Sequence, residues 1–390
     1  PPRSTLFPYT TLSDLEPEIA ALRIVGYYNQ LAGFIDVKRL DGSVDENVDS
    51  GDKTGGRIAL RFEPNENISI TPRFVYQKLD TDGFPRIDDF NILANPFTTT
   101  QPAVTLGERQ QYVQIEEGID DDFKLADLKM EFGFGKLTLT SVTSYTDRNV
   151  VVTRDATSLT GSISWDFGFP QPDIVRLSSR LVDTTDLQAF SQELRLASDA
   201  SGSLQWLVGA FYQDIDRDYS QFLPTPGWDA ATGLANGPQN NAVPDSPFFS
   251  GLDYKFQQFA LFGEGTYRFN EQWSLTAGLR YYDFKEDRVL NFGGQFADVT
   301  RDLPGDTSSD GFSPRAILAF DPTSDVQLTA QVSRGFRLGG INDPLNRPLC
   351  SPEDIVVFGN SQTFDDEKVW NYELRSEEHT SELQSQNRIS

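Results

Sequence analysis

Hydrophobic and polar residues alternate with a period of two along most of the chain between Leu22 and Leu374. The segment 326–333 is the clearest example, with polar residues between the apolar residues Val326, Leu328, Ala330 and Val332. Successive side chains of a β-strand point to opposite faces. Each such segment therefore predicts a strand with one apolar and one polar face.

The alternation recurs and predicts an all-β chain of roughly 12 strands. They lie at about 20–38, 55–63, 67–79, 110–132, 136–152, 184–198, 204–219, 255–269, 273–290, 311–321, 326–338 and 368–374. Pro72 and Pro314 fall inside two of these segments. Because proline lacks the N–H that a ladder needs, we expect a bulge or a local break at each. No helical pattern longer than a turn or two is found.

The connections between the predicted strands are short on one side and long on the other. Tight turns are predicted at 64–66, 133–135, 199–203, 270–272 and 322–325. Polar loops are predicted at about 40–54, 80–109, 153–183, 220–254, 291–310 and 340–367. This asymmetry is typical of an outer-membrane β-barrel, which has short periplasmic turns and long extracellular loops. The sequence thus predicts a transmembrane antiparallel barrel wall, with apolar rows toward lipid and polar rows toward the lumen.

Composition narrows the function classes. A net charge of −25 over 390 residues excludes a nucleic-acid partner, because phosphate binding needs surfaces rich in Lys and Arg. The single cysteine excludes an intrachain disulfide framework. No stretch approaches the ~18 apolar residues of a transmembrane helix, whereas a barrel strand needs only about 10 alternating residues. The aromatic content of 12% suits interfacial girdles.

The two ends of the chain resemble translated sequencing adapters. The tail carries RSEEHTSELQS at 375–385, and the head carries TLFPYTTL at 5–12. We therefore expect 1–13 and 375–390 to be adapter-derived, and 14–374 to be the partial barrel domain. The only histidine, His379, lies in that tail. A body without histidine excludes His-based triads and imidazole zinc sites, so we expect no enzyme, no catalytic residue, no bound metal and no cofactor.

Several runs carry a family resemblance. The runs 191–198 (SQELRLAS) and 204–212 (LQWLVGAFY) form one hairpin, and 259–267 (FALFGEGTY) and 273–282 (WSLTAGLRYY) form another. Together with 333–337 and 369–374 they resemble the TonB-dependent outer-membrane receptors, over nearly all of 15–374. The resemblance implies a barrel of roughly 22 strands that is plugged by an N-terminal domain. It also implies energy-coupled uptake of a scarce nutrient, typically a ferric siderophore, cobalamin or an oligosaccharide.

The sequence departs from the family pattern in having no plug domain, no energy-coupling box and no terminal aromatic strand. We therefore expect an internal fragment that holds about half of a barrel, in the bacterial outer membrane. The resemblance implies three kinds of partner. They are a nutrient chelate, the TonB inner-membrane complex acting through the missing N-terminal region, and lipid with lipopolysaccharide.

Two other interpretations stay open. A passive diffusion porin, or another barrel without a plug, would share the alternation, and conductance without an energy source would distinguish it. A secreted, soluble all-β carbohydrate-active protein would bury its apolar rows in a dry core. The asymmetry of the loops disfavours this last interpretation.

Four residues are candidates for ligand contact. Arg334 and Arg337 flank Phe336 near the outer end of a strand, where arginines facing the lumen can bind an anionic chelate by charge-assisted hydrogen bonds. An ion pair with a neighbouring strand is the alternative for these arginines. Phe84 and Trp228 lie in predicted loops, which often carry function. The alternative for both aromatic residues is packing within the loop or a place in the girdle.

Overall fold

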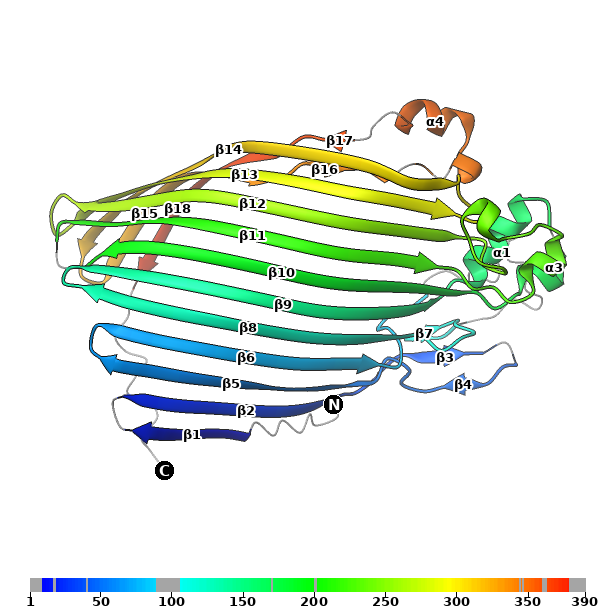
Figure 1. Cartoon of the computed structure of the whole chain (residues 1–390), viewed down its shortest axis with the longest axis horizontal. Coiled ribbons are helices and arrows are strands. Elements are labelled where there is room, and N and C mark those ends of the chain that lie inside the picture. Colours follow the sequence, from blue (N-terminus) through cyan, green and yellow to red (C-terminus); the bar gives the residue numbers. More distant parts are fainter. Residues whose placement is uncertain are drawn as a thin grey trace.

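The structure is a computed structural model that describes residues 9–16, 19–39, 41–88, 106–169, 171–199, 202–343, 345, 347–359 and 363–378. His379 and most of the adapter-like ends lie outside these residues. The main feature is one antiparallel sheet of 13 strands whose order follows the chain. Figure 1 shows the sheet as a broad wall of long strands. The wall is open, since its first and last strands each pair with one neighbour only.

Every predicted strand has a counterpart in this sheet, and one further strand, β1, precedes them. The strands of the wall are β1 (Tyr9–Glu16), β2 (Ala20–Leu31), β5 (Gly51–Asn65), β6 (Ile68–Thr81), β8 (Gly118–Phe134), β9 (Leu137–Asp155), β10 (Arg180–Ser198), β11 (Leu204–Phe222), β12 (Phe249–Arg268), β13 (Trp273–Gly293), β14 (Thr300–Thr323), β15 (Val326–Arg337) and β18 (Glu367–Glu378). β1 and β18 cross the predicted domain boundaries at 13 and 374. Those boundaries stay a prediction, because a strand does not reveal the origin of its residues.

All tight turns lie at one end of the wall, the turn end, and the loops and helices gather at the other, the loop end (Figure 1). The loop end carries β3 (Asp36–Lys38), β4 (Val44–Asp45), β7 (Gln110–Gln111), α1 (Thr157–Asp166), α2 (Pro172–Val175), α3 (Trp228–Thr232), η2 (Pro238–Asn240), β16 (Gly340–Ile341), η3 (Arg347–Leu349), α4 (Pro352–Phe358) and β17 (Thr363–Phe364). Within the described ranges, no helix is long and apolar enough to cross a membrane. The predicted asymmetry of turns and loops is confirmed.

Two sequence predictions were wrong at the loop end. The predicted loop 291–310 shrinks to 294–299, because β14 begins at Thr300 and pairs with β13 over polar residues. Pro304 is tolerated there, because β14 has no β15 partner at that height and proline is accepted on such an edge. The predicted loop 153–183 contains the ten-residue helix α1, which lacks a side-chain cap and an amphipathic pattern. Contacts with neighbouring loops, rather than local preference, hold α1 in place.

The two prolines interrupt the ladders as predicted. At Pro72 the β5–β6 partners pass from Ala59↔Arg73 to Phe62↔Ile70 with no pairs between them. At Pro314 the β14–β15 ladder ends one residue away, at Arg315↔Ser333. On its other side each proline stays in register with the next strand. Each break is therefore local and confined to one ladder.

The outer face of the wall carries an exposed apolar band between two levels of aromatic residues. On β13, Leu275 and Leu279 are 37% and 50% exposed. Trp273 stacks on Phe320 with ring centroids 4.3 Å apart, and Tyr281 lies 5.3 Å from Phe312. At about 3.3 Å of rise per residue and ~40° of tilt, these two levels are roughly 20 Å apart. An exposed band of this height fits lipid, and a soluble sheet would bury it.

The inner face is polar and charged at the same height. Arg73 Nε lies 2.6 Å from Asp127 Oδ2, and Arg315 Nη1 lies 3.7 Å from Glu264 Oε2. Both pairs join neighbouring or nearby strands on the face that the register places opposite the exposed apolar band. The predicted separation of apolar and polar rows onto opposite faces of the strands is confirmed.

Candidate ligand-binding site on the inner wall

Above the upper aromatic level the inner face of the wall is no longer open. The inner row of β13 is buried there, at Tyr282, Phe284, Glu286, Arg288, Leu290 and Phe292. Part of the cover comes from the described residues of 338–366, between β15 and β18, which we call the inner segment. Ile341 of this segment lies so close to Gly305 of β14 that a Cβ there would stand 3.3 Å from Ile341 Cδ1. Glycine at this position thus allows the segment to approach the wall closely.

The inner segment reaches this place because β15 leaves the sheet plane. β15 pairs with β14 only as far as Arg315↔Ser333. Three residues later, the Phe336 ring stacks on Tyr282 of β13, with centroids 3.7 Å apart. Since Tyr282 belongs to the strand beyond β14, the chain after Ser333 has turned across the inner face.

Asp366 fastens the far end of the inner segment to the wall. Its Oδ2 accepts hydrogen bonds from Ser309 Oγ at 2.5 Å and from Tyr282 Oη at 3.0 Å. Its Oδ1 accepts from the backbone N–H of Gly339, at the start of the same segment, at 2.9 Å. Burial alone would raise the pKa of Asp366, but these hydrogen bonds outweigh it and lower the pKa. One carboxylate thus ties both ends of the segment to β13 and β14.

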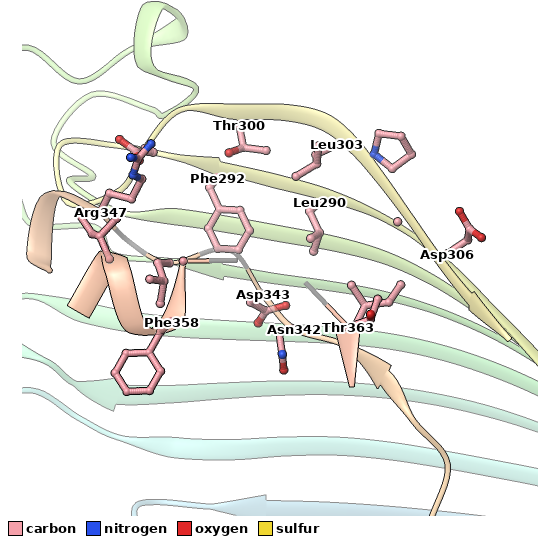
Figure 2. Close-up of a pocket in the computed structure, with 17 residues that line it drawn as sticks. Leu290, Phe292, Thr300, Leu303, Asp306, Asn342, Asp343, Arg347, Phe358 and Thr363 are labelled. Atoms are coloured by element: carbon pink, nitrogen blue, oxygen red, sulfur yellow. The ribbon is translucent and has the colours of Figure 1, made fainter. Parts of the chain in front are cut away.

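A cavity of about 570 Å³ lies between the inner segment and the outer ends of β13 and β14 (Figure 2). Its apolar lining comes from both sides, with Leu290, Phe292 and Leu303 on the strands and Ile341, Ile355 and Phe358 on the segment. Its polar lining includes Asp298, Asp306, Asn342, Asp343 and Arg347. A cavity with aromatic walls and a few charged groups can hold a small organic ligand and orient it.

A buried charge cluster adjoins the cavity. Arg217, Tyr254 and Arg288 are in register across β11, β12 and β13, and the side chain of Arg288 is only 8% exposed. Arg288 Nε lies 3.6 Å from Glu286 Oε1, and Arg288 Nη1 lies 3.4 Å from Asp343 Oδ1 of the inner segment. The Arg217 guanidinium lies 5.0 Å from the centre of the Tyr254 ring. Asp343 is thus shared between the cavity wall and this cluster.

Burial shifts the titration of the cluster, which stands above the apolar band. It raises the pKa of Glu286, although Arg288 and Arg217 oppose that shift. Burial, together with the charge of Glu286, raises the pKa of Tyr254 to about 12. Burial and a hydrogen bond to Asp183 raise the pKa of Tyr219 further along the same face. The site therefore disfavours additional buried negative charge unless it lies next to an arginine.

A second loop cluster packs beside the site. Its buried members are Ala156, Leu223, Trp228 and Phe296, which we call the Trp228 core. The Trp228 indole is fully buried, and its Nε1–H donates to Ser164 Oγ at 3.0 Å. Phe296 meets it edge-on at 5.6 Å. The buried indole donor of this cluster is thus satisfied by a side chain of α1.

The four predicted site residues lie in three different places. Arg334 is half-buried where β15 leaves β14, and its carbonyl accepts from Ser313 Oγ. Arg337 is exposed and lies 3.7 Å from Glu367 on β18, which is the ion pair weighed as the alternative. Phe84 lies 5.9 Å under the Arg86 guanidinium in the loop after β6, and Trp228 is at the centre of its own core. Ligand contact by these four stays a prediction.

The residues that build the cavity and its charge cluster were not predicted. Glu286 and Arg288 sit on the inner row of β13, and their alternation with Lys285 and Asp287 was a usable signal. Two charges facing inward above a membrane strand could have marked the wall of a vestibule. Asp343 and Asp366 gave no such signal, because only the fold brings them to β13.

The comparison with protein families decides the identity of the wall. The family model described as "TonB dependent receptor-like, beta-barrel" matches residues 61–380. The chain belongs to the TonB-dependent receptor family. A comparison with curated protein sequences gave no match.

Solved structures agree on the fold of this TonB-dependent receptor chain. It is similar to the ferric yersiniabactin uptake receptor of Yersinia pestis, with a TM-score of 0.71 and 11% identity over 97% of this chain and 50% of that one. A siderophore receptor of Acinetobacter baumannii gives a TM-score of 0.60 and 16% identity over 96% and 52%. A copper transporter gives 0.60 and 11% over 96% and 49%.

The chain thus spans about half the length of the structures it matches. At these identities the likeness concerns the fold only. Together with the family membership, it identifies the wall as part of an outer-membrane β-barrel receptor. The loop end of the sheet is accordingly the extracellular end, and the turn end is periplasmic.

Proposed function

We propose that this chain forms part of the wall of a receptor that takes up a scarce nutrient, such as a ferric siderophore, across the outer membrane. The observation that carries the proposal is the cavity between β13, β14 and the inner segment, on the extracellular third of the inner wall. It joins apolar walls to charged groups at the place where a ligand arriving from outside would first meet the barrel.

A chelated nutrient suits this cavity better than a free ion does. Leu290, Phe292 and Phe358 offer apolar contact to an organic chelator, while Asn342 and Arg347 offer polar contact. Of the similar structures, one is named for ferric yersiniabactin uptake, one as a siderophore receptor and one as a copper transporter, so the shared fold alone does not select the ligand. Cobalamin and oligosaccharides remain within the proposed ligand class, and the receptor acts on none of them as an enzyme.

The energy source and the remaining partners form part of the same proposal. The TonB inner-membrane complex would act through a region of the receptor outside this chain. Lipid and lipopolysaccharide would contact the outer face, where Leu275 and Leu279 are exposed. Among the predicted residues, Arg334, Arg337 and Phe84 are proposed to contact ligand. Trp228 would do so only if its loops opened, since it is fully buried.

Uptake of a labelled ferric siderophore by cells that express the full receptor tests the proposal. We expect uptake that stops when the proton-motive force is collapsed. Leu303→Trp would fill the cavity and should lower uptake, whereas Leu275→Trp, on the lipid face, should not. Ion conductance by the purified receptor without any energy source, combined with uptake that needs none, would instead favour the passive porin.

A further inference from the structure

We infer that Arg288 is the binding point for a carboxylate group of the ligand, and that Asp343 is the internal carboxylate which this ligand group displaces. The inference rests on the proposed function and names a chemical group that the ligand carries. It begins from the hydrogen-bonding state of Arg288 in the part of the chain that the structure describes. There, the Nε and Nη2 donors of Arg288 are buried and have no hydrogen-bond partner.

These two donors belong to one edge of the guanidinium group, which can bind both oxygens of a carboxylate side by side. The same wall shows that edge in use. Arg148 Nε donates to Asp121 Oδ1 at 2.9 Å, and Arg148 Nη2 donates to Asp121 Oδ2 at 2.6 Å. On Arg288 the same edge makes no hydrogen bond within the described residues, and the nearest carboxylate oxygen, Glu286 Oε1, stays 3.6 Å from Nε.

The charges of the cluster leave room for one more anion. Arg217 and Arg288 both act on the buried carboxylate of Glu286, and these three groups together carry a net charge of +1. Asp343 supplies a fourth charge from the inner segment, but its side chain is 66% exposed and it meets only Nη1, at 3.4 Å. An exposed partner at this distance contributes little. A ligand carboxylate on the empty edge would pair far better.

The cavity gives a ligand access to Arg288. The arginine does not line the cavity itself, but Asp343, Leu290 and Gly305 do, and Gly305 is its register partner on β14. A Cβ on Gly305 would stand 3.9 Å from Arg288 Cγ, so the two residues lie in van der Waals reach across β13 and β14. Displacement of the Asp343 side chain would open the path from the cavity to the arginine. The ligand carboxylate would thus bind Nε and Nη2 as Asp343 leaves Nη1.

Citrate is a suitable probe, titrated by calorimetry into the full receptor in detergent at fixed ionic strength. We expect the wild-type receptor to bind citrate. It should not bind triethyl citrate, which carries no carboxylate. Loss of a two-point charged hydrogen bond predicts that Arg288→Gln and Arg288→Lys weaken binding about ten- to a hundredfold. Asp343→Asn removes the competitor and should tighten binding about two- to fivefold.

Lys285→Gln is the matched control, because it removes one positive charge from the same strand on the opposite face, where Lys285 pairs with Asp287 at 2.8 Å. It should leave citrate binding unchanged. Equal citrate affinity in the wild type and Arg288→Gln would overturn the inference, and so would absence of binding in both the wild type and Asp343→Asn. Siderophore uptake in the same strains tests the proposed function separately. Siderophore uptake without citrate binding would contradict only the inference. Citrate binding without siderophore uptake would contradict only the proposed function.

Discussion

The two loop clusters at the extracellular end each bury a large side chain with polar atoms. They differ in whether the buried N–H donors of that side chain are hydrogen-bonded. In the Trp228 core the largest side chain is fully buried and its only polar atom is bonded to Ser164. Under the inner segment, Arg288 is buried to a similar degree. Yet two of its nitrogens make no hydrogen bond within the described chain, and a cavity of about 570 Å³ lies beside it.

This difference separates a scaffold from a site. The Trp228 core stabilises the loops, and its buried indole donor is already paired with Ser164. A buried donor without a partner costs free energy that an incoming acceptor can recover. The same wall thus holds a supporting cluster, the Trp228 core, beside a proposed binding site at Arg288.

The largest effect is expected from Trp228→Ala. It removes a fully buried indole from contact with Phe296 and leaves a cavity, which costs about 3–5 kcal/mol. Hydrogen exchange over α1 and α3 should rise strongly, while exchange over β13 should change little. Trp370→Ala, at a tryptophan that is 50% exposed, is the control and should alter neither region. Equal protection of α1 in Trp228→Ala and wild type would show that this cluster is no scaffold.

Asp366→Ala should have a smaller and more local effect. It removes the acceptor of three hydrogen bonds, from Ser309, Tyr282 and Gly339, on a half-buried carboxylate. We expect a loss of about 1–3 kcal/mol in the attachment of the inner segment. Limited proteolysis within 338–366 should accelerate, while cleavage in the Trp228 core stays slow. Asp365→Ala, at the exposed neighbouring aspartate, should leave both rates unchanged.

Acid should weaken the same attachment without a mutation. The pKa of Asp366 is lowered from the ordinary value of 3.8 in the folded chain, so its charged form is favoured by folding. The stabilisation is therefore complete above about pH 3.8 and is lost as the pH falls through the lower folded value. Proteolysis of the inner segment should rise below that pH in the wild type. In Asp366→Asn the rate should already be high and should not change over that range. A wild-type rate that is flat through the same acid range would contradict the anchoring role.

The sequence predicted the strands of the wall well, because a strand with one apolar and one polar face has a period of two in its residue pattern. The alternation of residues was enough to place the row from Trp273 to Leu279 on the lipid face. No information about the neighbouring strands was needed. The first residues of β14 escaped prediction because 300–310 has no apolar alternation. Its place in the sheet is set by pairing with β13.

The candidate site was harder to predict, because its contacts join distant parts of the chain. Tyr282 and Asp366 are 84 residues apart, and no local pattern links them. Trp228 was a candidate for ligand contact because it lies in a predicted loop, with packing within the loop as the alternative. Its neighbour Ser164, 64 residues earlier, instead gives it a core, and this contact depends on how two loops fold over the wall.

The smallest effect is expected from Arg337→Ala, which tests whether the site extends beyond Arg288. Arg337 and its partner Glu367 are 70% and 63% exposed at a distance of 3.7 Å, so their ion pair should contribute only about 0–1 kcal/mol to stability. Thermal unfolding should therefore be nearly unchanged. Siderophore uptake that falls at unchanged stability would mean that Arg337 meets the ligand and that the site reaches along β15. Uptake equal to that of the wild type would confine the anion-binding part of the site to Arg288 and leave Arg337 as a surface ion pair. Glu367→Ala is the control, since it breaks the same pair but leaves the positive charge in place.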